Sequence, residues 1–253
     1  MFFDTHAHLN DERFNNERDE LISSLPQNQV GAYCEIGYDI QSSKKALSLA
    51  EKYDFVYAAC GVHPHDTQNL TEADMTKLKE LLNHPKAVAL GEIGLDYYYD
   101  NSEREKQRHW FNRQLALAAE LDKPVTIHTR DAMADTIDIL KANPKNTGII
   151  HCYSGSKESG KILLNMGYYI SFAGPLTFKN ANTALEVAAF VPDDRILIET
   201  DSPYLAPVPY RGKCNCPIYV AEIAKKLSQI RGVSLEYIAE KTFENAKMAY
   251  RIK

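Results

Sequence analysis

The sequence lacks any apolar run long enough to cross a bilayer, and its first residues lack the pattern of a signal peptide. A membrane-spanning helix needs about 20 consecutive apolar residues, so we expect no segment to enter a membrane. A basic region followed by an apolar core is also missing, because His6, His8 and the charged residues Asp11, Glu12 and Arg13 interrupt such a pattern. We therefore expect a cytoplasmic protein.

The sequence also has too few basic residues for strong, non-specific binding of nucleic acid, and its cysteines do not suggest a disulfide-stabilised fold. The formal net charge is -5 at pH 7, so no global positive field would hold a polyanion, and any contact with nucleic acid is expected to be weak and local. Five cysteines, an odd number, fit reduced thiols rather than a disulfide framework. The sequence also has no serine or cysteine triad, phosphate-cradling glycine loop or dinucleotide fingerprint.

The alternation of strand-like and helix-like segments predicts the fold. A chain of 253 residues with 44% hydrophobic content can bury the core of one α/β barrel, a single domain over residues 1–253. The expected strands cover residues 2–5, 31–36, 55–60, 88–91, 125–128, 148–151, 168–172 and 196–200. The expected helices cover residues 41–53, 71–83, 102–121, 132–142, 157–166, 181–190, 218–229 and 234–249. This order predicts a (β/α)8 TIM barrel. A doubly wound open sheet is the alternative, because periodicity does not show closure.

Histidines and carboxylates recur where the expected strands end. Side chains alternate along a strand, so His6 and His8 point the same way from the end of the first one. Later strands end in four further candidate ligands: Glu92, His128, His151 and Asp201. Any one of them alone is more often a structural polar residue. Six such residues at the same end of separate strands instead predict a site for two divalent metal cations, with Glu92 as the bridge between them.

One of these six ligands and two further residues are candidates for additional roles at this site. Asp201 is the best candidate for a combined metal ligand and proton acceptor. Glu199 shares its strand face, and would orient an imidazole, help to hold another ion or form a structural ion pair with a Lys or Arg. His63, in the segment Gly61-Val62-His63-Pro64-His65, is a candidate for substrate contact, with a structural role as the alternative.

Cations and aromatics follow some of the same strands. Arg130 lies just after His128, and Arg211 and Lys213 follow Asp201 in a loop rich in Pro and Tyr. Such groups beside a metal pair suit an anionic phosphate, although a solvated loop also explains them. The run Tyr97-Tyr98-Tyr99 would either stack on bases or pack at the rim of the barrel.

Six short motifs occur in order along nearly the whole chain: DTHAH at 4–8, GVHPH at 61–65, GEIGLD at 91–96, PVTIH at 124–128, HCYSG at 151–155 and ETDSPYL at 199–205. Together they resemble the TatD family of metal-dependent deoxyribonucleases, within the amidohydrolase-type barrels. The resemblance implies a TIM barrel and phosphodiester hydrolysis, typically from the 3′ end of DNA, with magnesium, manganese or zinc. It places the metal ligands at the same six residues. Family members commonly have Arg and Glu where this chain has Cys214 and Cys216, which implies an altered contact with the DNA backbone.

These observations predict a metal-dependent hydrolase that cleaves DNA. We expect a monomer that acts as a 3′-5′ exonuclease on single-stranded DNA, through a water activated by two metals, with Asp201, Glu92 and His63 as catalytic residues. The first alternative is an ester or amide hydrolase, such as an aminoacyl-tRNA deacylase. The second is a non-catalytic metal-binding or scaffold protein, which has little use for six ligands at the active face of a barrel.

Overall fold

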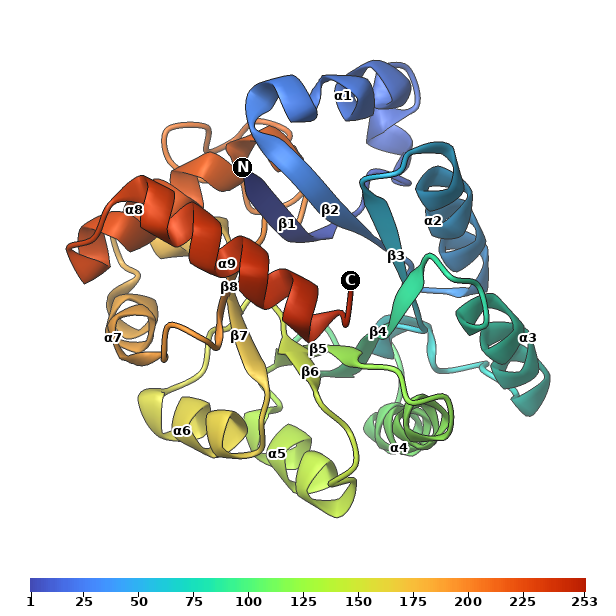
Figure 1. Cartoon of the computed structure of the whole chain (residues 1–253). Coiled ribbons are helices and arrows are strands. Elements are labelled where there is room, and N and C mark those ends of the chain that lie inside the picture. Colours follow the sequence, from blue (N-terminus) through green and yellow to red (C-terminus); the bar gives the residue numbers. More distant parts are fainter.

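Eight parallel strands form the centre of the molecule in the computed structural model, which describes residues 1–253 (Figure 1). They pair in chain order. Their bounds are β1 (Phe2–Ala7), β2 (Val30–Ile36), β3 (Val56–Cys60), β4 (Ala87–Asp96), β5 (Val125–Arg130), β6 (Gly148–Ile150), β7 (Tyr169–Phe172) and β8 (Ile196–Ile198). The end of β1 meets the segment after β8, where the His8 N–H donates to the Ser202 carbonyl at 2.7 Å and the Asp201 N–H to the His6 carbonyl at 2.8 Å. The predicted (β/α)8 barrel is confirmed, and the open-sheet alternative is wrong.

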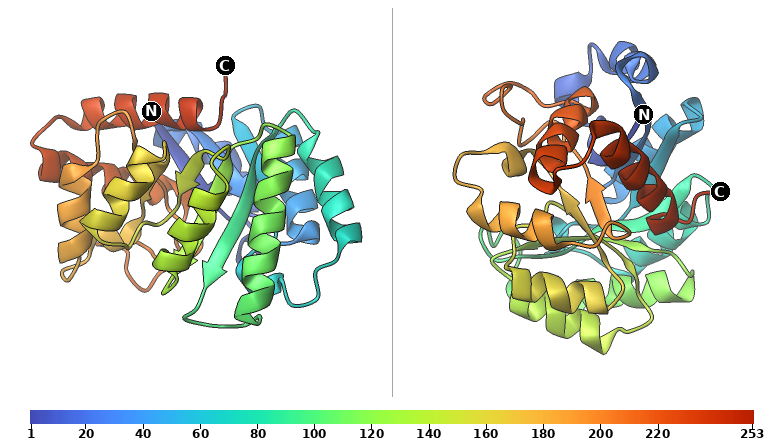
Figure 2. Two further views of the ribbon diagram at one scale, coloured as in Figure 1. Left: turned by 90° about the horizontal axis from the view of Figure 1, so that it is seen from below. Right: turned by 60° about the vertical axis from the view of Figure 1, so that its left-hand side comes forward.

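Helices surround this barrel on the outside (Figure 1). Their bounds are α1 (Arg18–Ser24), α2 (Ile40–Lys52), α3 (Glu72–Leu82), α4 (Arg104–Glu120), α5 (Met133–Ala142), α6 (Lys157–Asn165), α7 (Asn182–Phe190), α8 (Val220–Arg231) and α9 (Leu235–Ala249). No helix combines the length and the apolar character needed to span a membrane. The α9 helix lies across the end of the barrel where the strands begin, near the N-terminus (Figures 1 and 2).

Two hydrophobic clusters form the core. The larger one contains 49 buried residues and fills the layer between strands and helices. The smaller one contains 12 buried residues, and includes Phe3 near the start of β1 and Tyr250 after α9, whose rings lie 6.0 Å apart. The Tyr250 hydroxyl donates to the Thr5 carbonyl at 2.6 Å. Because α9 and this cluster close one end of the barrel, the opposite end is left for polar side chains.

The structure corrects several expected element bounds. The β1 and β5 strands each run two residues further than expected, to Ala7 and Arg130, and β8 ends two residues earlier, at Ile198. Glu199 and Asp201 therefore follow β8 and do not share a face of that strand. The β4 strand runs to Asp96, five residues beyond the expected end at 91, so Glu92 lies within the strand rather than after it. Its pairing with β5 shifts register between Leu90 and Ile93, where an extra residue interrupts the regular ladder. The α4 helix begins at Arg104 rather than 102, because Ser102 caps nothing and instead donates to the His65 carbonyl at 2.8 Å.

One helix was not expected from the sequence at all. The α1 helix covers seven residues between β1 and β2, and buries only Ile22. Its apolar residues are too few to produce a recognisable helical period. By contrast, α3 starts as its capping pattern predicts: Thr71 accepts from the Asp74 N–H, and Asp74 accepts from the Thr71 N–H.

Candidate metal centre

The six predicted ligands lie together at the end of the barrel opposite α9. The first group comes from β1 and the segment after β8. The Nε2 atoms of His6 and His8 are 3.2 Å apart. The Oε2 atom of Glu92 lies 3.4 Å from His6 Nε2 and 3.7 Å from His8 Nε2. The Oδ1 atom of Asp201 lies 3.7 Å and 3.6 Å from the same two nitrogens. Four candidate ligand atoms therefore surround one point.

The second group faces the other oxygen of the same carboxylate. Glu92 Oε1 lies 3.0 Å from His128 Nδ1 and 2.9 Å from His151 Nε2. These two imidazole nitrogens are 3.3 Å apart. His63 approaches from β3, with its Nε2 atom 3.6 Å from Glu92 Oε1. Each oxygen of Glu92 thus belongs to a different set of histidines, as a bridging carboxylate requires.

These spacings fit divalent cations. Ligands bound at about 2.1 Å in tetrahedral or octahedral geometry are separated from their neighbours by about 3.0 to 3.4 Å. The atoms of both groups lie near that range, and each close pair of imidazole nitrogens shares one oxygen of Glu92 as a neighbour. Imidazole nitrogen and carboxylate oxygen are ligands for zinc and, with water, for manganese and magnesium. The donor set therefore fits two adjacent metal ions.

Hydrogen bonds orient three of the imidazoles toward the centre. His8 Nδ1 donates to the Ile36 carbonyl at 3.2 Å, and His151 Nδ1 donates to Glu199 Oε1 at 3.1 Å. His128 uses the opposite nitrogen, since its Nε2 donates to Asp96 Oδ2 at 3.0 Å. In each ring the hydrogen-bonded nitrogen holds the proton, which leaves the lone pair of the other nitrogen for a cation.

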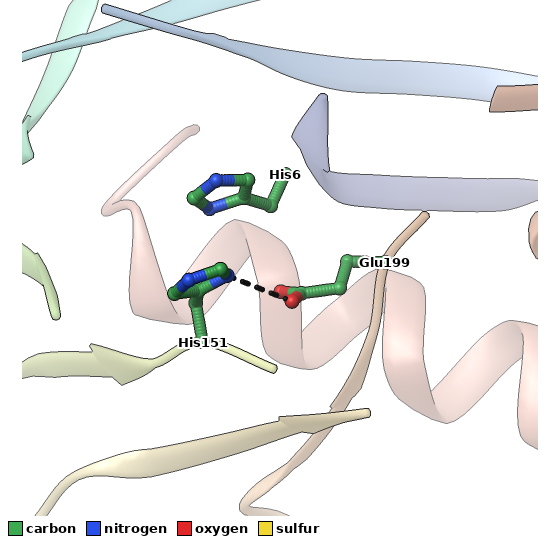
Figure 3. Close-up of side chains that lie close together, drawn as sticks. All are labelled: His6, His151 and Glu199. Carbon is green, nitrogen blue, oxygen red and sulfur yellow. Dashed lines mark hydrogen bonds and ion pairs between the residues drawn. The ribbon is translucent and has the colours of Figure 1, made fainter. Parts of the chain in front are cut away.

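Glu199 is placed to orient an imidazole, and with His6 and His151 it also forms a group that could hold a metal ion, so two of its three expected roles fit the structure. Figure 3 shows the carboxylate of Glu199 beside the ring of His151, which stacks on His6 with ring centroids 4.0 Å apart. The same Oε1 atom accepts the Cys152 N–H at 2.7 Å. No Lys or Arg contacts Glu199 in the structure, so a structural ion pair with such a residue is wrong.

The electrostatics keep both central carboxylates ionised. Burial raises the pKa of Glu92, but the nearby His151 imidazole and a hydrogen bond with His128 outweigh burial and hold this pKa well below its usual range. Burial likewise raises the pKa of Asp201, but a hydrogen bond from His8 and nearby imidazoles lower it further than burial raises it. Two buried carboxylates that remain charged are suited to bind cations.

Asp96 is a site residue that sequence reasoning missed. It is fully buried at the end of β4, accepts from His128, and also accepts the Tyr98 and Tyr99 N–H groups at 3.0 Å and 2.9 Å. His65 Nε2 lies 3.1 Å from the same carboxylate. The sequence does contain a pattern that predicts this position, because residues 92 and 96 are four apart and would share one face of a strand. It was overlooked because the strand was expected to end at 91.

The three predicted cations surround the centre at the rim, and none of them forms an ion pair with a carboxylate. The guanidinium of Arg130 lies 4.0 Å from the ring centroid of Tyr98 and 4.7 Å from that of Tyr99. Arg211 lies 4.0 Å from the ring of Phe178, and Lys213 lies 5.8 Å from that of Tyr210. All three cations are exposed. Their charges are therefore free to meet an anionic ligand.

Two of the three tyrosines in the run 97–99 are surface residues. Tyr98 is 58% exposed and Tyr99 is 55% exposed. Tyr97 differs, since its hydroxyl donates to Asp135 at 2.6 Å and it packs against the core. Tyr97 therefore packs against the core, while the rings of Tyr98 and Tyr99 pack on each other and on Arg130 at the rim. Cys214, where the family resemblance leads one to expect Arg, is also exposed, and Cys216 is partly buried.

Comparisons with known proteins agree with this geometry. A family model described as "TatD related DNase" matches residues 3–251. An uncharacterized metal-dependent hydrolase of Bacillus subtilis is 44% identical and covers 100% of both chains. A protein of Salmonella typhimurium named "3'-5' ssDNA/RNA exonuclease TatD" is 31% identical and covers 99% of both chains.

A solved structure shares the whole architecture. The crystal structure of a TatD homologue from Escherichia coli K12 matches with a TM-score of 0.94 and 28% identity, covering 100% of this chain and 98% of the other. The relatives with the higher identities carry no named substrate, since the Escherichia coli relative at 37% identity is also described as an uncharacterized metal-dependent hydrolase. The family match, the shared barrel and the histidine and carboxylate cluster together show that this chain belongs to the TatD family of metal-dependent hydrolases.

Proposed function

We propose that this hydrolase cleaves phosphodiester bonds in single-stranded DNA from the 3′ end, as a monomer that binds two divalent cations. The observation that carries the proposal is the shared carboxylate of Glu92, whose two oxygens face separate groups of histidines. The unpaired cations at the rim favour a phosphate-containing substrate. The relatives named as 3′-5′ exonucleases on single-stranded DNA or RNA, at 31% and 33% identity, support the same substrate class.

The proposal assigns ligands to each cation. His6, His8 and Asp201 would hold the first cation, His128 and His151 the second, and Glu92 would bridge the pair. When bound, the two cations lower the pKa of a water molecule and stabilise charge on the phosphoryl and leaving oxygens. Magnesium, manganese and zinc all remain candidates, because the set mixes imidazoles with carboxylates.

Asp201 and His63 are placed to move protons and orient the substrate. The side chain of Asp201 is 14% exposed and that of Glu92 is 6% exposed, so Asp201 is the more accessible of the two carboxylates and the better proton acceptor. His63 accepts the His65 N–H at its Nδ1 atom at 3.2 Å. Burial lowers the pKa of His63 well below its usual range. The neutral ring therefore carries its proton on Nε2, where it faces the centre and can donate to a substrate oxygen.

The first test is hydrolysis of 3′-labelled and 5′-labelled single-stranded DNA by metal-stripped protein, with magnesium, manganese or zinc added back separately. The proposal predicts metal-dependent loss of nucleotides from the 3′ end. A parallel panel of ester and amide substrates, including an aminoacyl-tRNA, tests the alternative. Cleavage in that panel alone, by protein that binds two metals, would overturn the phosphodiester assignment.

Replacing Arg130 with Ala is expected to raise KM for a single-stranded oligonucleotide about 10- to 100-fold, because a charge-assisted hydrogen bond contributes about 1.5 to 3 kcal/mol. The value of kcat should change little, since the side chain lies at the rim. Steady-state kinetics at two salt concentrations measures both effects. Arg195→Ala is the control, because Arg195 is a partly exposed arginine just before β8, at the opposite end of the barrel. Equal KM values for the two variants would contradict a phosphate contact at Arg130.

Replacing Asp96 with Ala is expected to weaken binding of one of the two cations about 10- to 100-fold, which is the usual effect of removing a group that orients a ligating imidazole. The His128 ring loses the acceptor of its Nε2 proton. Metal titration followed by calorimetry should show one weakened site and one unchanged site. Two sites with wild-type affinity would show that Asp96 does not orient a metal ligand.

A further inference from the structure

A cavity of about 270 Å³ opens beside the metal centre, between the loops that follow β6 and β7. Its walls come from the segment after His151, the 3-10 turn at 174–177 and the start of α7, and α7 lies alongside α6 on the outside of β7 (Figure 1). Eight of its twelve lining residues are hydrophobic, and include Tyr153, Phe172, Leu176 and Phe178. No residue assigned above as a metal ligand lines this cavity.

Hydrogen bonds join the wall of this cavity directly to the metal centre. Cys152, in the wall, donates its N–H to the same Glu199 oxygen that accepts from His151 Nδ1. The Glu199 N–H in turn donates to the carbonyl of Phe172, another wall residue, at 3.1 Å. The wall of the cavity and His151, a candidate metal ligand, are therefore held by one shared carboxylate, which makes the cavity a neighbour of the centre.

The walls of the cavity are held in place by local hydrogen bonds. The Tyr153 hydroxyl donates to the Ser156 carbonyl at 2.6 Å. The Thr177 hydroxyl donates to the Gly174 carbonyl at 2.7 Å, and accepts the Val208 N–H at 2.9 Å. The same turn packs so closely on the following loop that a Cβ at Gly174 would overlap the Leu205 carbonyl. The cavity is thus preformed, which lowers the entropic cost of filling it.

The chemistry of the lining excludes a phosphate and favours a ring. No Lys or Arg lines the cavity, so an anion would lose its hydration there without a cation to replace it. Aromatic and aliphatic walls instead suit a flat group with apolar faces, and Ser154, Asn180 and Thr183 supply polar atoms for its edge. The volume is slightly below that of pockets for whole drug-sized molecules, which start at about 300 Å³.

We propose that this cavity binds the nucleobase of the 3′-terminal nucleotide whose phosphate lies at the metal centre. The inference rests on the proposed function and specifies its substrate contacts. Arg211, stacked on Phe178 at the edge of the cavity, is placed to hold the phosphate oxygen of that same nucleotide. The cavity accepts one base, so it selects a single unpaired terminal nucleotide and leaves no room for its partner in a duplex.

A binding experiment tests the cavity without depending on turnover. Calorimetric titration, with manganese present, compares deoxyadenosine 5′-monophosphate with 2-deoxyribose 5-phosphate, which lacks the base. Base stacking in such sites strengthens binding enough that the nucleotide should bind about tenfold tighter or more. Ala184→Phe, which fills the cavity from α7, should remove that difference and leave the affinity for the sugar phosphate unchanged.

Two further variants keep the test decisive. Ala189→Phe makes the same change at an exposed position of the same helix, and should retain the tenfold preference. If Ala184→Phe does not fold, Thr183→Trp narrows the cavity from its exposed edge. Equal binding of the two ligands to the wild-type protein, or no binding of either, would overturn the proposal.

The outcomes also separate this proposal from the proposed function. Suppose that the wild-type protein binds the nucleotide more tightly, that Ala184→Phe abolishes this preference, and that no oligonucleotide is cleaved. This result would support the base site and contradict the exonuclease proposal. Cleavage of oligonucleotides together with equal binding of the two ligands would keep the exonuclease and reject the base site. An oligonucleotide that ends in an abasic residue should be cleaved about tenfold more slowly than one with a terminal base if both proposals hold.

Discussion

Replacing Asp201 with Asn is expected to lower the turnover of single-stranded DNA by about 10³-fold or more while leaving the fold intact. General base catalysis alone contributes about 10²- to 10⁴-fold, and an amide neither accepts a proton nor ligates a cation as a carboxylate does. The fold should persist because the hydrogen bond that closes the barrel at this residue is made by its backbone N–H to the His6 carbonyl. Labelled-DNA hydrolysis and a thermal melt measure the two expectations.

The control for this substitution is a carboxylate outside the centre. Asp194 is exposed before β8 and contacts Arg195, so Asp194→Asn should leave turnover within about twofold of the wild type. Turnover by Asp201→Asn at the wild-type rate, with two cations bound, would remove Asp201 from the mechanism. If the variant loses both turnover and the folded state, the Asp201 side chain would instead be needed to close the barrel between β1 and the segment after β8.

The residues that cluster at the metal centre could be predicted from the sequence, because the same geometric rule applies to every strand of a parallel barrel. Side chains at the carboxyl ends of parallel strands meet at one end of the barrel. His6 and His8 follow from alternation along β1, and His151 from the end of β6. These inferences need only approximate strand ends. An error of one or two residues at the end of β6 or β8 therefore did not change the predicted ligands.

The orientation of those side chains could not be predicted from the sequence, because it depends on register shifts between strands and on hydrogen bonds to backbone carbonyls. Glu92 faces two groups of histidines from within β4, where the pairing with β5 shifts register. A shift of this kind comes from tertiary packing and leaves no periodic signal in the sequence. The acceptor for His8 is the Ile36 carbonyl, an atom that every residue type possesses. Which nitrogen of an imidazole faces the centre is therefore a property of the fold.

Replacing Glu92 with Gln is expected to remove most of the stabilisation that metal binding gives the protein, as well as its turnover. Each cation at 100 times its Kd stabilises the folded state by about 2.7 kcal/mol, and 1 kcal/mol shifts Tm by about 2 to 4 °C in a chain of this size. Two cations should therefore raise the wild-type Tm by about 10 to 20 °C. The neutral amide has a single acceptor oxygen, and its NH2 group would face one of the two histidine groups, so the shift should fall below about 5 °C.

Differential scanning calorimetry of metal-stripped protein, before and after addition of manganese or zinc, measures this shift. Glu120→Gln is the control, since Glu120 is exposed on α4 and contacts Lys79, and its metal-induced shift should equal that of the wild type. A wild-type shift in Glu92→Gln with lost turnover would mean that Glu92 acts on substrate without holding a cation. A shift reduced to about half, with one cation retained, would assign Glu92 to a single cation. Only the loss of nearly the whole shift supports a carboxylate shared by both, because only a shared ligand couples the two binding events.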